Sequence, residues 1–298
     1  MSRQARCSVV IPAYGPSAFL ATAIRSIGPE DADEIVVIDD GGPEACRWVV
    51  DIDPRVVYHR QINSGVAVAR NQGILRASGE VVALLDQDDV FTPNKCSRLI
   101  ARMVETGSTF AYSGFALMDG KGRRTGPGWG REVDYEQLLS GETGIQLSAL
   151  VMSKAALSRV GLFDPDLRYA GDQKMALRLL RDERGCFIAD ELIDYRLHDD
   201  NASRRHRDVA AEMLHVWRAE RQLCDTPSRR AAHRRGMTKL RTLFGWQSHD
   251  ARLQQRREGR HLDSVKEWAW GAVLDPRGSA TRAVHSAAVR SGRRGQEP

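Results

Sequence analysis

The sequence lacks long apolar runs and paired cysteines. No apolar run approaches the roughly 18 residues that a membrane-spanning helix requires, and the first residues enter a strand-like segment without the apolar core of a secretory leader. The five cysteines are odd in number and include no C-x-x-C pair, which argues against a disulfide framework and against a thiolate zinc site. We therefore expect a cytoplasmic protein in a reducing compartment.

Net positive charge is absent from the first two thirds of the chain and concentrated in the last third. Residues 1–203 carry 23 Lys and Arg against 29 Asp and Glu, whereas residues 204–298 carry 21 against 10, so the formal net charges are −6 and +11. We place a domain boundary between these ranges and expect a basic helical extension, with a disordered tail from about Ser286. Its arginines suit a solvated helix face, nucleic acid, an anionic membrane or an acidic partner.

Short Val/Ile/Leu runs alternate with helical patterns through the first 203 residues. Strand-like runs lie at 7–11, 34–38, 56–58 and 81–85, and helical spacing of apolar residues follows at 17–27 and 66–77. A parallel sheet that is covered by helices on both faces requires this alternation. We therefore predict an α/β fold with a mostly parallel sheet, and we expect its ligand site at the carboxyl ends of the strands.

Carboxylates close the second and the fourth of these runs. Asp40 ends the second and is followed by two glycines, a pattern that presents a carboxylate to a base or ribose but also makes an ordinary turn. Asp86, Asp88 and Asp89 end the fourth. Because packing like charges costs free energy, such a cluster indicates a hard divalent cation bound through oxygen, Mg²⁺ or Mn²⁺.

The alternative for the fourth run is helix capping. Thr92 and the proline after it have the residue types of a helix N-cap and a first helical position. Capping would account for Thr92 and for Asp89, but it would leave Asp86 and Asp88 without a role.

Two later residues carry further chemistry. Asp172 follows a glycine at the start of a predicted helix, where a carboxylate serves either as an N-cap or as a general base. His198 ends a short apolar segment and is a candidate nitrogen ligand for the metal, although a lone histidine is more often structural. Between them and the first acids, a Gly-rich segment at 120–130 contains Trp129 and predicts either an active-site lid or a hairpin turn.

The order of these patterns resembles the family 2 glycosyltransferases of the GT-A fold, from Ser8 to about Ser203. The matching segments are Val-Val-Ile-Pro-Ala-Tyr ending at Tyr14, Val-Ile-Asp-Asp-Gly ending at Gly41, Asn-Ser-Gly-Val-Ala-Val-Ala-Arg-Asn from Asn63, Leu-Asp-Gln-Asp-Asp from Leu85, Gly-Asp at 171–172 and Arg-x-His at 196–198. The resemblance implies a GT-A type α/β domain over residues 1–203 with a Rossmann-like nucleotide-binding half. Residues 204–298 would follow it as a helical extension.

The resemblance also implies roles for individual residues. Asp172 corresponds to the catalytic base, Asp88 to the metal-binding carboxylate and His198 to a second metal contact. The donor-binding positions are Pro12, Ala13, Tyr14, Asp40, Arg70 and Asp86, with Asp40 accepting a hydrogen bond from a uracil-like imide. The chain departs from the family at Gly42, where Ser is frequent, and at Gly171, where Glu is frequent.

The activity so implied is an inverting transfer from a nucleotide-diphosphate sugar, with a UDP-sugar favoured, to an acceptor hydroxyl. The sugar class is a hexose or an N-acetylhexosamine, Mn²⁺ or Mg²⁺ is the cofactor, and the acceptor is a carbohydrate, a lipid-linked molecule or a small molecule. One alternative is a nucleotidyltransferase that makes nucleotide sugars. The other is a non-catalytic module that binds anionic partners through its basic region.

Partners other than substrates are expected at residues 204–298 alone. No nucleic acid is expected, and a peripheral contact with the inner face of the membrane or with a protein is left open for this segment.

Overall fold

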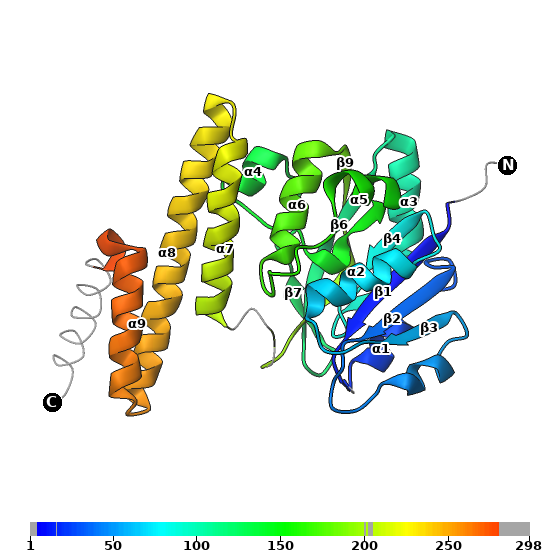
Figure 1. Cartoon of the computed structure of the whole chain (residues 1–298), viewed down its shortest axis with the longest axis horizontal. Coiled ribbons are helices and arrows are strands. Elements are labelled where there is room, and N and C mark those ends of the chain that lie inside the picture. The colour runs from blue at the N-terminus through cyan, green and yellow to red at the C-terminus, as the bar shows by residue number, and fades with distance from the viewer. Residues whose placement is uncertain (1–4, 16, 200, 202–204, 280–298) are drawn as a thin grey trace. The chain divides into compact units, whose positions relative to one another are not determined.

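The computed structural model describes residues 5–15, 17–199, 201 and 205–279. Contacts divide the chain into two compact units, one with residues 1–138 and 143–201 and the other with residues 139–142 and 202–298. Figure 1 labels the elements of both units. The tail that the sequence predicts from Ser286 lies outside the described residues.

In the described part of the first unit, nine strands form one sheet. The strands are β1 (Cys7–Ala13), β2 (Glu34–Asp39), β3 (Val56–Arg60), β4 (Val81–Leu84), β5 (Val90–Phe91), β6 (Phe110–Asp119), β7 (Arg124–Pro127), β8 (Val151–Ser153) and β9 (Gly185–Leu197). The helices between them are α1 (Leu20–Arg25), η1 (Arg47–Asp51), α2 (Val66–Arg76), α3 (Lys95–Thr106), α4 (Tyr135–Leu139), η2 (Leu147–Ala149), α5 (Lys154–Val160) and α6 (Gly171–Asp182). The predicted α/β class is confirmed.

The sheet order is β3-β2-β1-β4-β8-β6-β9-β5, with β7 paired to β6. The first four strands are parallel, in keeping with the predicted parallel sheet. Beyond β4 the sheet is mixed, because β8 runs antiparallel to both β4 and β6 whereas β6 and β9 are parallel. The 13-residue strand β9 was missed by sequence reasoning, since its exposed acidic residues interrupt the apolar pattern.

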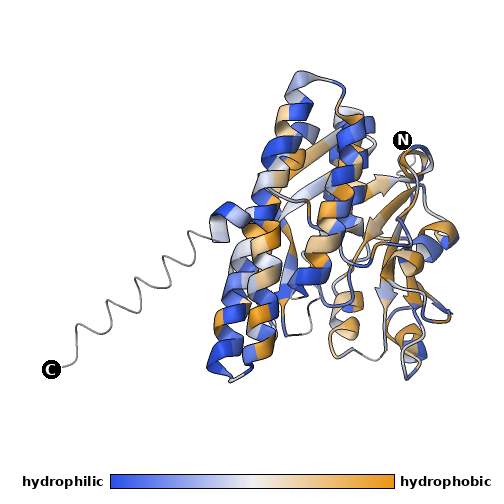
Figure 2. Cartoon of the chain, turned by 60° about the vertical axis from the view of Figure 1, so that its left-hand side comes forward, coloured by the Kyte–Doolittle hydropathy of each residue, from blue (hydrophilic) through white to orange (hydrophobic). Residues whose placement is uncertain are grey.

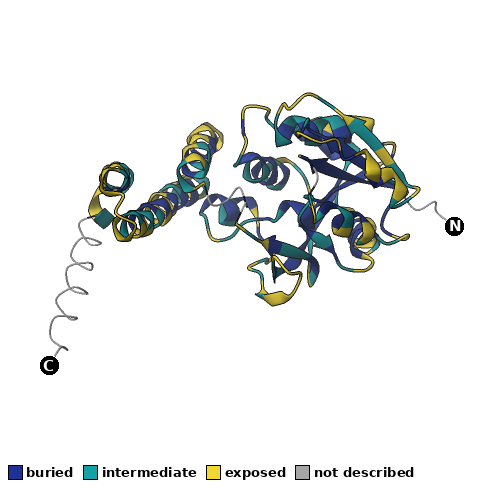
Figure 3. Ribbon diagram, turned by 90° about the horizontal axis from the view of Figure 1, so that it is seen from below, coloured by how far each residue is buried: buried dark blue, intermediate teal, exposed yellow. Residues whose placement is uncertain are grey.

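Helices cover both faces of the parallel half of the sheet. Alternate residues of a strand point to opposite faces, so a continuous apolar strand presents apolar side chains to helices on each face. Val9 and Ile11 of β1 pack with α1 and α3 in one apolar core. On the other face α2 lies on β1 so closely that a Cβ on Gly73 would lie 2.2 Å from Val10 Cγ1. β1, β2 and β4 are buried along nearly their whole length. Figure 2 colours much of the sheet as hydrophobic, and Figure 3 colours much of it as buried.

The helix after the acid cluster starts later than the capping pattern predicts. The helix after the acid cluster begins at Lys95 behind Asn94, whose φ is +63°, so Thr92 is not its N-cap. The Thr92 N–H instead donates to Leu192 O of β9 at 3.0 Å. The chain is drawn into the sheet there, because Phe91 in β5 pairs with β9. Capping therefore accounts for none of the three acids.

The Gly-rich segment forms a hairpin, in which β7 pairs antiparallel with β6. Trp129 follows this hairpin with an exposed side chain, and its ring meets Phe115 edge to face at 5.0 Å. Of the two predictions for residues 120–130, the hairpin is the one present in the structure.

The second unit is helical, with α7 (His206–Glu220), η4 (Arg221–Leu223), α8 (Pro227–Arg257) and α9 (His261–Leu274). Trp217 of α7 is buried and donates from Nε1 to Leu139 O at 2.8 Å, which ties residues 139–142 to this unit. Thr226 caps α8 by accepting from Arg229 N. Within the described ranges, no helix is both long and apolar enough to traverse a bilayer.

Candidate functional site

Three parallel strands bring the predicted residues to one edge of the sheet. β1, β2 and β4 end at Ala13, Asp39 and Leu84, and each is followed at once by a segment with polar groups. The Asp40 N–H donates to Ala13 O at 2.7 Å, so the ends of β1 and β2 stay in register. Pro12 and Ala13 are buried in β1, whereas Tyr14 beyond the strand end is exposed. This edge is where ligands bind in open α/β sheets.

Asp40 is buried and closes the loop that leads into α2. Its Oδ1 accepts hydrogen bonds from Gln61 Nε2 at 2.7 Å and from Ser64 N at 2.8 Å, and its Oδ2 accepts one from Gly65 N at 2.9 Å. The carboxylate therefore has a structural role in the free protein. A carboxylate oxygen has two lone pairs, so Oδ2 keeps acceptor capacity for a ligand.

The glycines after Asp40 are required by close backbone contacts. Gly41 has φ +72°, and a Cβ on it would lie 2.5 Å from Asn63 N. A Cβ on Gly42 would lie 2.2 Å from Gly15 N, well inside van der Waals contact. The departure from Ser at position 42 therefore has a steric cause in this chain, because the loop after β1 packs directly on the backbone of Gly42.

Arg70 and Asp86 form an ion pair across the site. Arg70 of α2 reaches Asp86 Oδ1 with Nη2 at 2.6 Å, and the guanidinium lies over the Phe163 ring at 5.6 Å. Its Nε is buried without a hydrogen-bond partner. The pair is mostly shielded from water, so it fixes the orientation of Asp86 while one guanidinium donor remains to be satisfied.

Asp88 meets His198, although 110 positions separate them in the sequence. Asp88 Oδ2 lies 2.8 Å from His198 Nε2, and both side chains are partly buried. Burial raises the pKa of Asp88, and the charge of Asp86 raises it further. The His198 ring lies 5.3 Å from that of Phe19, which holds the imidazole from the other side.

Asp89 and Ser148 hold this arrangement together and were not assigned from the sequence. Asp89 is buried and accepts from Ser148 Oγ at 2.6 Å and from Arg196 N at 3.1 Å, which joins the end of β9 to the acid segment. The Asp86 N–H donates to the same Ser148 Oγ at 3.1 Å. Burial raises the pKa of Asp89 well above its usual range. A lone serine in η2 has no sequence signal that would reveal this role.

Asp172 is the second residue of α6, so the N-cap interpretation is wrong. The N-cap position belongs to Ala170, which has no side-chain capping bond, and Asp172 Oδ1 accepts from Gln173 N at 2.7 Å. Burial raises the pKa of Asp172, the charge of Arg70 lowers it, and the charge of Asp86 raises it. Asp172 thus lies within electrostatic reach of the Arg70–Asp86 pair. Charges from α2, from α6 and from the segment that follows β4 therefore form one cluster.

The side chains of this site include few possible ligands for a divalent metal ion. Among the described residues, no three His, Cys, Asp or Glu side chains converge in a way that would hold a metal. Asp88 and His198 are the pair with suitable spacing, since neighbouring ligands of an octahedral ion with bonds of about 2.1 Å lie about 3 Å apart. The two residues fit a site in which a diphosphate and water supply the remaining ligands.

Known proteins are similar in sequence to this chain over most of the residues that form the candidate site. The model of the family described as Glycosyl transferase family 2 matches residues 8–163. An uncharacterized glycosyltransferase of Rickettsia bellii is 32% identical over 126 residues, which cover 41% of this chain and 18% of that protein. The uncharacterized glycosyltransferase RT0329 of Rickettsia typhi is 24% identical over 221 residues, 70% of each chain. The chain thus spans less than a fifth of the first of these relatives.

Solved structures show the same fold. The mannosyltransferase PcManGT from Pyrobaculum calidifontis, in complex with GDP-Man and Mn²⁺, aligns with TM-score 0.61 and 16% identity over 97% of this chain and 81% of that chain. S. aureus TarS 1-349, in complex with UDP-GlcNAc, aligns with TM-score 0.59 and 14% identity over 91% and 92%. These likenesses confirm the predicted GT-A fold.

Proposed function

The chain belongs to glycosyl transferase family 2, and from this membership we propose that it transfers a sugar from a nucleotide-diphosphate sugar to an acceptor hydroxyl with inversion at the anomeric carbon. The observation that carries the proposal is the convergence of Asp172, the Arg70–Asp86 pair and the Asp88–His198 pair at one edge of the sheet. Such a cluster of desolvated charges costs folding free energy and is typical of active sites.

Asp88 and His198 are the proposed protein ligands of a Mn²⁺ or Mg²⁺ ion. When bound, the ion neutralises charge that develops on the departing diphosphate. Asp89 keeps the acid segment in place through Ser148 and Arg196, so the ligand geometry is fixed before the substrate arrives. The complex of the Pyrobaculum enzyme with Mn²⁺ supports the choice of metal by analogy.

Asp172 is the proposed general base. The acceptor hydroxyl oxygen attacks the anomeric carbon, the bond from that carbon to the diphosphate oxygen breaks, and the hydroxyl proton passes to Asp172. A raised pKa brings the basicity of a carboxylate nearer to neutral pH, which improves proton transfer. The charge of Arg70 opposes this shift.

The donor is proposed to bind along Pro12, Ala13, Tyr14 and Asp40, with Arg70 and Asp86 nearer the sugar. Asp40 Oδ2 has acceptor capacity for a base imide, which favours a UDP-sugar. The TarS complex with UDP-GlcNAc supports a uridine donor, whereas the Pyrobaculum complex with GDP-Man makes a guanosine donor the alternative to test. The sugar is a hexose or an N-acetylhexosamine, and the acceptor is a carbohydrate, a lipid-linked molecule or a small molecule.

A donor screen tests the proposal. Purified full-length protein is incubated with UDP-, GDP- and dTDP-sugars, with Mn²⁺ or with a chelator, and release of each nucleoside diphosphate is followed. We expect metal-dependent release from one nucleotide class, at least from slow hydrolysis when the acceptor is absent. Release that the chelator does not reduce would contradict the metal assignment, and no release from any nucleotide sugar would contradict the function.

A further inference from the structure

Helix α9 in the second unit buries polar residues and exposes apolar ones, which is the reverse of the usual arrangement in a surface helix. Its buried face carries Ser264, Glu267 and Gly271, which follow one another at helical spacing. Glu267 has 5% of its surface exposed, although glutamate is among the residues least often buried. A surface helix normally turns its polar residues outward, whereas the polar inner face of α9 leaves several of its apolar residues on the outside.

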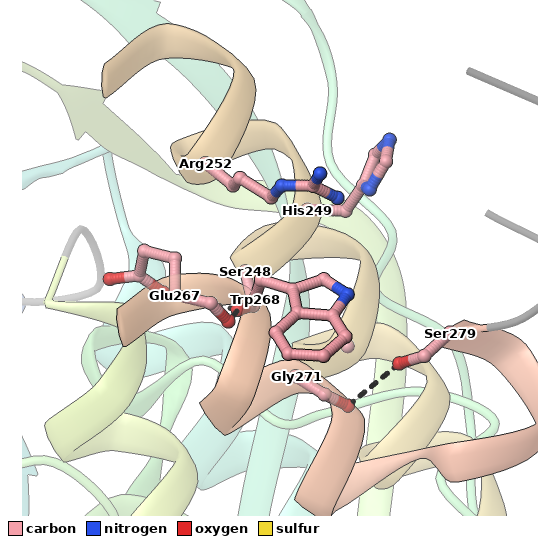
Figure 4. A pocket seen from close by; sticks show the side chains of 8 residues that line it. Ser248, His249, Arg252, Glu267, Trp268, Gly271 and Ser279 are labelled. Carbon is pink, nitrogen blue, oxygen red and sulfur yellow. Dashed lines mark hydrogen bonds between the residues drawn. The ribbon is translucent and has the colours of Figure 1, made fainter. Parts of the chain in front are cut away.

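Specific bonds hold the polar face of α9 inward. Ser248 Oγ of α8 donates to Glu267 O at 2.6 Å and lies 3.1 Å from Glu267 Oε2, and Arg207 Nε of α7 lies 2.8 Å from Glu267 Oε1. Figure 4 shows Ser248 and Glu267 beside a small pocket between α8 and α9, with Gly271 at its floor. Because Glu267 is bonded to two other helices, α9 cannot rotate to bury its apolar side without breaking these contacts.

The outer face of α9 forms an apolar stripe, which we define as Leu262, Val265, Ala269 and Val273. These residues are spaced by three or four positions and lie on one side of the helix. All four are exposed, with 80% of the surface of Leu262 and 82% of that of Val273 open to solvent. Trp268 is a further exposed apolar residue at the margin of the stripe.

The apolar stripe is small for a protein interface. Its four residues extend over roughly 17 Å of helix at about 1.5 Å per residue, whereas a stable interface takes about 20–30 residues from each partner. Pairing with a second copy would also bring together two segments of net charge +11. Both observations disfavour self-association through this face.

Basic residues border the apolar stripe. Arg256 and Arg257 end α8, Arg260 precedes α9, Lys266 is the exposed cation within α9, and Arg277 follows its end. A basic surface alone would suit any polyanion, but nucleic acid gains nothing from exposed Leu and Val side chains. A lipid surface with anionic headgroups complements the cations and the apolar stripe together.

We propose that α9 lies in the plane of an anionic bilayer, with the apolar stripe in the headgroup boundary and the neighbouring arginines on acidic lipid phosphates. This inference is independent of the proposed function, because every residue it uses belongs to the second unit. It would bring the enzyme to acceptors at a membrane surface without a spanning helix.

Vesicle co-sedimentation of the full chain tests the proposal. Vesicles of phosphatidylcholine with and without phosphatidylglycerol are compared at low and high salt. We expect binding to the anionic vesicles that weakens with salt, and roughly tenfold or greater loss of binding for L262S/V273S. Both residues are exposed, so the variant should fold. The matched control, L223S/L243S, removes two exposed leucines of the same unit outside the stripe and should bind like wild type.

Four results would overturn the proposal. Equal vesicle binding by L262S/V273S and wild type would show that the stripe does not enter the bilayer. Absence of wild-type binding to anionic vesicles at low salt would reject the surface altogether. A dimer in analytical ultracentrifugation that L262S/V273S converts to a monomer would assign the stripe to a second copy, and duplex DNA binding without vesicle binding would assign the basic residues to nucleic acid.

Discussion

The two units bury charge for different purposes. In the first unit, Asp88, Asp89 and Asp172 are desolvated at one edge of the sheet, and burial raises the pKa of each. In the second unit, buried Glu267 pairs with Arg207 of α7, lies 3.3 Å from His206 Nε2 and contacts Ser248 of α8, so it joins α7, α8 and α9. Buried charge marks the candidate active site in the first unit and holds helices together in the second.

Substitution of a buried acid should therefore affect mainly activity in the first unit and mainly stability in the second. An acid whose pKa is raised by burial destabilises the fold when it is ionised, because stability is highest below that pKa and falls as the pH rises through it. Replacing such an acid with a neutral residue should therefore stabilise the fold and lower the activity. Replacing an acid that is paired inside a helix bundle should destabilise the fold and leave the activity unchanged.

Asp88→Asn is expected to have the largest effect on turnover. The amide keeps the bond to His198 but loses the charge that we propose binds the metal, so transfer should fall by about 10³-fold or more. The midpoint of thermal unfolding should not fall at neutral pH, since the ionised carboxylate is the destabilising form. Asp190→Asn, an exposed acid of β9, is the control and should keep full activity. An active Asp88→Asn enzyme would show that Asp88 does not bind the metal.

Asp172→Asn should lower transfer by about 10²-fold or more and leave donor affinity unchanged. Asn cannot accept the proton, and the lost charge at the start of α6 costs only about 0.3–1 kcal/mol of helix stabilisation. In wild type, activity should fall on acidification at a pH above the ordinary aspartate pKa of 3.8, because burial raises the pKa of Asp172. A pH profile of kcat/KM measures this, and an acid limb that persists in Asp172→Asn would assign it to another group.

His198→Gln should have a smaller effect that added metal can reverse. Asp88 remains as a ligand, so the divalent ion concentration needed for half-maximal activity should rise by roughly 10–100-fold while the rate at saturating metal changes little. His59→Gln, a partly exposed histidine of β3, is the matched control. If the metal requirement of His198→Gln equals that of the control, the contact between His198 and Asp88 is structural.

The parallel half of the fold could be predicted because β1, β2 and β4 are buried on both faces. β1 has an unbroken apolar run apart from Ser8, and a periodicity argument needs little else. β9 could not be predicted in this way, since the exposed Asp190 and the partly exposed Glu191 break the run. The pairing of β5 with β9 is likewise a long-range contact that moves the helix N-cap from Thr92 to Asn94.

The candidate site was predictable where chemistry leaves a local pattern. Asp86 and Asp88 follow a recognisable strand and Asp172 begins a helix, and the structure brings Asp88 and Asp172 within electrostatic reach of Asp86. Ser148 and the Arg196 N–H left no pattern, because their role depends on where Asp89 comes to lie. The reverse orientation of α9 was equally hidden, since its sequence alone does not say which face is buried.

Gly236→Ala should have the smallest effect on turnover and tests whether the comparison of the two units holds. A Cβ at this position of α8 would lie 2.0 Å from Leu139 O and 2.7 Å from Trp217 Nε1, so it would break the hydrogen bond between them. Overpacking of this kind costs about 1–3 kcal/mol. Hydrogen exchange should rise in α7 and α8, whereas exchange in β1 and the metal-dependent release of nucleoside diphosphate should stay near wild type. Gly107→Ala, at a glycine with open space around its Cβ position but φ +63°, controls for backbone strain alone. A Gly236→Ala protein that loses donor turnover along with its helical contacts would show that the two units are not energetically separate, and the division of roles drawn between them would fail.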